Sequence, residues 1–64
     1  MNVVQIARKM WADGKTHGEI QATTGLSRHQ EFAATHAQDP ATVIELLELA
    51  DTMTARQILD YKGR

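Results

Sequence analysis

Three histidines are the side chains of this chain best suited to metal binding or proton transfer: His17, His29 and His36. His29 and His36 are seven residues apart, which places them on one face of a helix but about two turns from each other, too far to bind one ion together. Zinc needs three or four ligands in suitable geometry, and the chain has no cysteine. We therefore expect no metal site and no bound cofactor, and we interpret the histidines as exposed or partly packed side chains.

Catalytic arrangements are equally hard to find. The chain has no Gly-rich phosphate loop, no cysteine nucleophile and no pair of carboxylates with an obvious cleft, and Ser27 stands where a helix cap is expected. A chain of 64 residues also has little room for a pocket that excludes water. We expect a protein that is not an enzyme.

Helix starts are marked by paired capping residues. Four residues are each followed three positions later by Glu or Gln, a spacing that satisfies the first backbone N–H groups of a helix reciprocally. These four residues are Asn2, Thr16, Ser27 and Thr54. A fifth start is indicated by Asp39 before Pro40, because proline suits the first helical position.

Helix ends are marked by glycines that follow apolar periodicity, and no stretch alternates as a strand would. These glycines are Gly14, Gly25 and Gly63. We therefore expect an all-α fold of five short helices. We expect them near 3–13, 17–24, 28–37, 40–51 and 55–62, with ends placed to within a few residues.

The chain repeats itself with an offset of 38 residues. The block from Ala12 to Gly25 returns from Ala50 to Gly63, with five of six marker positions identical and the sixth Glu against Gln. In each copy a helix ends, a threonine caps the next helix and a glycine turn closes it. We expect one small domain, 1–64, with a three-helix unit in 1–38 and a partial second copy in 39–64. The second copy is either a brace with a dimer surface or a second unit cut short at Gly63.

Residues 16–30 resemble the helix-turn-helix segment of small bacterial and phage regulators, resolvase-type recombinases and small terminase subunits. The phrase Gly25-Leu26-Ser27-Arg28 carries the resemblance, with a turn glycine, an apolar plug, a helix cap and a basic residue. It implies that helix 17–24 crosses the DNA backbone and that helix 28–37 is the recognition helix in the major groove.

The resemblance also implies the contacts. Arg28 would pair with a guanine edge and Gln30 with an adenine, while Lys15 and the two threonines near helix ends would reach phosphates. The expected DNA-binding residues are Lys15, Thr16, Thr24, Ser27, Arg28, His29, Gln30 and Ala33.

Two positions depart from the family pattern. Gln21 stands where a small residue usually lets the two helices touch, and Glu31 stands where a branched apolar residue usually fills the core. A buried, unpaired carboxylate is too costly. We therefore expect helix 28–37 to be rotated or shifted so that Phe32 faces inward, or Glu31 to lie at an edge of the core.

Helix 40–51 carries an apolar stripe wide enough to serve two partners. One use is the core beneath the other helices, and the other is the surface of a homodimer or a groove for a partner's helix. The expected interface residues are Val43, Ile44, Leu46, Leu47 and Leu49. This stripe supports an alternative function, a protein-interaction module such as a phage-type adaptor or inhibitor of a host protein.

The formal net charge of −1 counts against a nucleic-acid binder, a class that is usually basic. Residues 1–38 hold four basic and three acidic residues, whereas 39–64 hold three basic and five acidic. No apolar run is long enough to span a bilayer and no signal peptide is recognisable, so we expect a cytoplasmic protein without a membrane partner. Together the motifs predict a small protein that binds double-stranded DNA, as a transcription regulator or DNA-targeting module, stabilised as a dimer because its own core is small.

Overall fold

The computed structural model describes residues 2–63, with Pro40 described by its backbone alone, and all regular elements in that range are helical. The predicted all-α fold is therefore confirmed. The α-helices are α1 (Val3–Ala12), α2 (His17–Thr24), α3 (Arg28–His36), α4 (Val43–Leu49) and α5 (Ala55–Asp60). Two 3₁₀ turns, η1 (Pro40–Thr42) and η2 (Ala50–Thr52), flank α4.

The predicted capping residues start four of these helices. At α1 the Asn2 side chain accepts from the Gln5 backbone N–H at 2.9 Å, and the Gln5 side chain accepts from the Asn2 N–H at 3.1 Å. The same reciprocal pair starts α3 and α5, while the Thr16 hydroxyl caps α2 by accepting from the Glu19 N–H. These bonds satisfy N–H groups that have no partner within the helix, so local sequence sets where each helix begins.

The expected helix 40–51 is present, but only residues 43–49 are α-helical and its two ends are 3₁₀ turns. Asp39 holds the first turn in 3₁₀ form: its carbonyl accepts from the Thr42 N–H and hydroxyl, and its side chain accepts from the Ala41 N–H. At the far end the Met53 N–H bonds to the Ala50 carbonyl three residues back, again a 3₁₀ spacing. Carbonyl groups at the end of α4 that have no partner within the helix accept hydrogen bonds from side chains. Gln30 Nε2, for example, donates to the Leu47 carbonyl at 3.2 Å.

The two copies of the repeat end differently. Gly25 directly caps α2 in left-handed conformation (φ 76°), and its N–H bonds to the Gln21 carbonyl at 2.8 Å. In the second copy α5 stops at Asp60, Tyr61 is extended, and Gly63 lies beyond the helix end, although its φ is also positive at 105°. The Tyr61 hydroxyl donates to Glu45 Oε2 at 2.6 Å, so contact with α4 holds the chain where the first copy continues as helix. Helix α5 is thus present as expected and ends at Asp60 rather than at residue 62.

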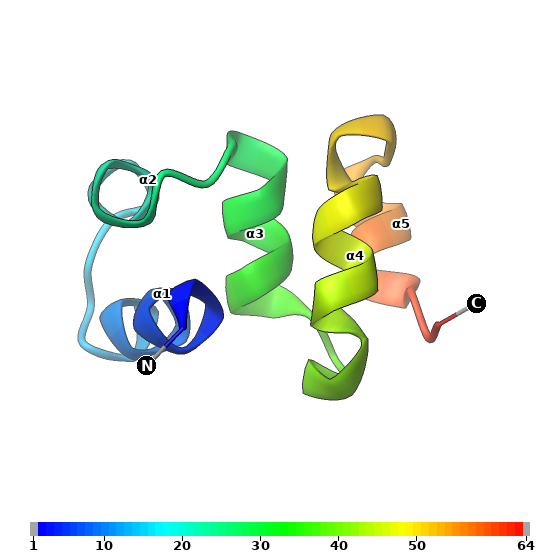
Figure 1. Cartoon of the computed structure of the whole chain (residues 1–64), viewed down its shortest axis with the longest axis horizontal. Helices are drawn as coiled ribbons and strands as arrows, with labels where there is room; N and C mark the ends of the chain where they lie inside the picture. Colours follow the sequence, from blue (N-terminus) through cyan, green and yellow to red (C-terminus); the bar gives the residue numbers. More distant parts are fainter. Residues whose placement is uncertain (1, 64) are drawn as a thin grey trace.

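Helix α3 is the central element of the fold. It lies between α1 and α2 on one side and α4, η2 and α5 on the other, as Figure 1 shows. Ala34 belongs to one small core with Ala7 and Ile20, and Ala33 belongs to a second core shared with α4 and α5. Neighbouring alanines on one helix thus serve two cores, since small side chains let helices approach on both sides.

The apolar stripe of α4 fills the second core. Val43 and Leu46 are buried there with Ala33, Ala50 and Ile58, and Leu47 packs against both cores. The expected dimer or partner interface is corrected accordingly, because Val43 and Leu46 are not at the surface and Leu47 is only partly so. Of the five residues expected there, Leu49 is half-buried and Ile44 is 64% exposed.

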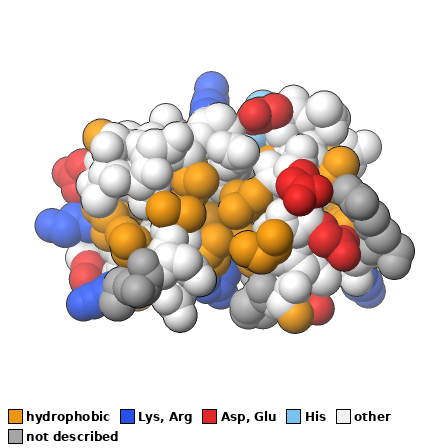
Figure 2. All heavy atoms as spheres, in the orientation of Figure 1, with side chains coloured by type: hydrophobic (Ala, Val, Ile, Leu, Met, Phe, Trp, Pro, Cys, Tyr) orange, Lys and Arg blue, Asp and Glu red, His pale blue; other side chains and the backbone are white. Residues whose placement is uncertain are grey.

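The surface reflects the charge difference between the two halves. Figure 2 shows apolar side chains across the centre of one face and acidic side chains gathered toward the half formed by α4 and α5. Within residues 2–63, none of the helices is both long and apolar enough to cross a membrane.

Replacing Leu46 with alanine should lower the free energy of unfolding by about 2–5 kcal/mol, because a fully buried leucine leaves a cavity. Ile44→Ala, two residues away on the same helix, should change it by less than about 1 kcal/mol because Ile44 is largely in solvent. Urea denaturation followed by circular dichroism measures both. Equal losses for the two variants would contradict this division of α4 into buried and exposed sides.

Candidate nucleic-acid interface

The N-terminal turn of α3 is fixed by the short connection that precedes it. Gly25 ends α2, Leu26 packs against the first core, and Ser27 caps α3. The Ser27 hydroxyl accepts from the Gln30 N–H at 3.2 Å, and the Gln30 side-chain oxygen accepts from the Ser27 N–H at 3.0 Å. This geometry leaves Arg28, the first residue of the helix, exposed to solvent.

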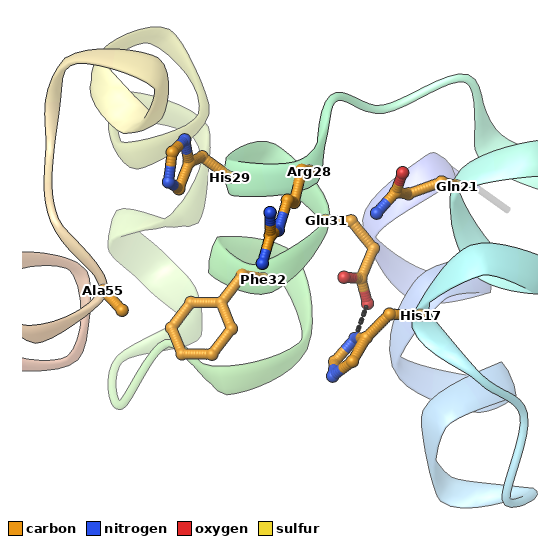
Figure 3. Close-up of a pocket in the computed structure, with 7 residues that line it drawn as sticks. All are labelled: His17, Gln21, Arg28, His29, Glu31, Phe32 and Ala55. Carbon is orange, nitrogen blue, oxygen red and sulfur yellow. Dashed lines mark hydrogen bonds and ion pairs between the residues drawn. The ribbon is translucent and has the colours of Figure 1, made fainter.

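An open hollow of about 570 Å³ lies over the exposed side of α3. Figure 3 shows it between α2 and the start of α5, with the side chains of α3 along its centre. Its lining residues come from α2, α3 and α5: His17, Gln21, Arg28, His29, Glu31, Phe32 and Ala55. Its polar groups are thus one guanidinium, two imidazoles, one amide and the Glu31 carboxylate, a set rich in hydrogen-bond donors.

Glu31 is 1% exposed, and although it lines the hollow, its carboxylate is paired with a side chain on α2. His17 Nδ1 lies 2.7 Å from Glu31 Oε1, and because a carboxylate can only accept, the imidazole carries its hydrogen on Nδ1. The Thr35 hydroxyl lies 3.5 Å from the same oxygen. The expectation that Glu31 would lie at an edge is wrong, because a partner on α2 makes burial of the carboxylate acceptable. Phe32 is partly buried and packs against the second core, as one of the two alternatives expected.

A cluster of rings surrounds this pair. Trp11 stacks on His17 with ring centroids 4.4 Å apart and also contacts His36 at 4.8 Å, while His36 stacks on Phe32 at 4.6 Å. The rings link α1, α2 and α3 and cover the His17–Glu31 pair from one side. Trp11 and Phe32 thus contribute to packing through ring contacts, although neither is fully buried.

The pairing of His17 with Glu31 was not predicted from the sequence, although a signal for it was present. The acidic residue at the core position required a donor, and His17 is the first residue of the helix that faces it. The interpretation of the histidines as partly packed side chains agrees with the positions of His17 and His36. Within residues 2–63, no three His, Cys, Asp or Glu side chains are grouped closely enough to hold a metal ion.

The expected DNA-binding residues separate into three groups. Lys15, Thr16, Arg28 and His29 are exposed. Thr24, Ser27 and Gln30 are half-buried, and their side chains already form hydrogen bonds within the protein.

Ala33 forms the third group. The expectation that it faces DNA is wrong, because it has no exposed surface and lies in the second core. The amide of Gln30 is also engaged at both ends, with Ser27 N–H and Leu47 O, which corrects the expectation that it would pair with an adenine edge. The side of α3 expected to continue the reading face is instead covered by α4 and α5.

Comparisons of the chain with protein-family models, curated protein sequences and solved structures find no match.

Replacing His17 with alanine should lower the free energy of unfolding by about 1–3 kcal/mol, because the buried Glu31 carboxylate loses its closest donor. Adding Glu31→Leu to that variant should recover much of the loss, since an apolar residue of similar volume needs no partner. Thermal and urea unfolding of the single and double variants form the cycle that measures the coupling. A double variant no more stable than His17→Ala would contradict the pairing as the reason that Glu31 is tolerated.

Proposed function

We propose that this protein binds double-stranded DNA through the exposed N-terminal end of α3, in the manner of the helix-turn-helix proteins that residues 16–30 resemble. The observation that carries the proposal is the removal of Glu31 from the contact face. A carboxylate exposed there would repel phosphates. Because the Glu31 carboxylate is buried and paired with His17, the exposed side chains of the first turn of α3 are those of Arg28 and His29.

The proposed contacts divide by chemistry. Arg28 reads a base edge, since a guanidinium fits the two acceptors of guanine and the first residues of a recognition helix approach the groove most closely. Lys15 and Thr16 directly precede His17, whose ring lines the same hollow, and they contact the phosphate backbone. Gln30 and Ala33 take no direct part, because one is bonded within the protein and the other is buried.

The proposed site is smaller than a complete recognition helix would provide. Only the first turn of α3 carries exposed side chains, and the later turns pack against α1, α2, α4 and α5. A single copy therefore offers few base contacts, and most of its affinity comes from charge. Binding is accordingly weak and steeply dependent on salt.

The test begins with a duplex enriched from a random-sequence pool at low salt and titrated by fluorescence anisotropy. Arg28→Ala should weaken binding by about 1–3 kcal/mol, because one base-edge contact is lost. The slope of log K against log salt concentration should fall in magnitude by roughly one, because one cation is lost. The matched control is Arg56→Ala on α5, which removes the same charge from an exposed residue already paired with Asp60 at 3.3 Å. The control should bind nearly as wild type does.

Failure to enrich any duplex at low salt, or equal affinities for Arg28→Ala and wild type, would contradict the proposal. Equal losses for Arg28→Ala and Arg56→Ala would also contradict it, because they would indicate attraction by total charge rather than contact at α3. Circular dichroism of each variant confirms that the fold is retained before the comparison is made.

A further inference from the structure

Asp51 lies against the N-terminal turn of α3, although it comes from the second copy of the repeat. Its Oδ1 accepts a hydrogen bond from the Ser27 hydroxyl at 2.7 Å, and the same oxygen is 4.0 Å from His29 Nδ1. The residue belongs to η2, which packs against α3. A carboxylate that is 61% exposed is thereby held beside two of the residues expected to contact DNA.

The Ser27 hydroxyl that holds Asp51 is a donor that a DNA phosphate would also use, and His29 lies close to the same oxygen. The first turn of a helix presents unpaired N–H groups and partial positive charge, and a hydroxyl and an imidazole at that turn add hydrogen-bond donors. Phosphate contacts in DNA complexes commonly use such a turn. The carboxylate of Asp51 therefore occupies a position that would otherwise attract a phosphate.

The hydrogen-bond pattern fits a charge that is held in place. Ser27 has one hydroxyl hydrogen, and it is donated to Asp51 while the oxygen accepts from the Gln30 N–H. The hydroxyl thus acts as a donor and as an acceptor at the same time. A phosphate oxygen could take the Ser27 hydrogen only by displacing Asp51.

We propose that Asp51 is a specificity-determining residue that competes with backbone phosphate at the first turn of α3. It lowers sequence-independent attraction to DNA, which depends on charge, and leaves the base-edge contact of Arg28 intact. The ratio of the affinity for a preferred sequence to the affinity for an unrelated sequence rises as a result. This inference rests on the DNA-binding function proposed above and assigns the acidic second copy a role in it.

Asp51→Asn tests the inference, because asparagine keeps the shape and an oxygen that accepts from Ser27 while the charge is removed. The matched control is Asp60→Asn at the end of α5, which removes one negative charge from another exposed carboxylate. Each variant is titrated by anisotropy with the enriched duplex and with a duplex of unrelated sequence, over a series of salt concentrations. Thermal unfolding checks that both variants remain folded.

We expect Asp51→Asn to bind the unrelated duplex about 3- to 10-fold more tightly than wild type at low salt, with the gain shrinking as salt rises. The enriched duplex should gain less, so that discrimination between the two falls. Asp60→Asn should change either affinity by less than about twofold, as expected for an exposed charge at a distance from the contact.

Equal behaviour of the two variants, or weaker binding by Asp51→Asn, would overturn the inference. In that case, if wild type binds and Arg28→Ala does not, the proposed function stands and only the role of Asp51 fails. If neither wild type nor Asp51→Asn binds any duplex, both the proposed function and the inference fail.

Discussion

The buried carboxylate of Glu31 is the constraint on which the first half of the structure depends. At 1% exposure it needs a hydrogen-bond donor, and His17 supplies one at 2.7 Å from the first turn of α2. That bond fixes the start of α2 against the middle of α3, and Trp11 of α1 closes over it by stacking on the imidazole. This pair acts together with the core of Ala7, Ile20 and Ala34 in setting how the three helices are placed.

The same constraint connects the fold to the proposed function. Because Glu31 is paired inside, the first turn of α3 presents the side chains of Arg28 and His29 to the hollow, and the later turns pack on both sides. Helix α3 is poor in large apolar side chains, yet its alanines lie in two cores. The exposed contact surface is therefore confined to the helix start, where Asp51 of the second half also reaches it.

Local chemistry made much of this fold predictable. The starts of α1, α2, α3 and α5 follow from cap residues that bond within one turn, and the left-handed Gly25 follows from the same kind of short-range pattern. What escaped prediction depends on contacts between distant residues. The donor for Glu31 is 14 residues away on another helix, and the burial of Ala33 requires α4 and α5 to cover a helix whose composition resembles an exposed one. The early end of α5 likewise depends on Tyr61 meeting Glu45 across 16 residues.

The central claim is that DNA is contacted at the first turn of α3 and at the start of α2. Its most direct test is an NMR titration of isotope-labelled protein with a duplex, in which the chemical shifts of the backbone amides are measured. The predicted result is a set of changes concentrated at Lys15, Thr16, Arg28 and His29, with little change along the exposed side of α4 around Ile44. Changes centred on α4, or none at any residue at low salt, would contradict the claim.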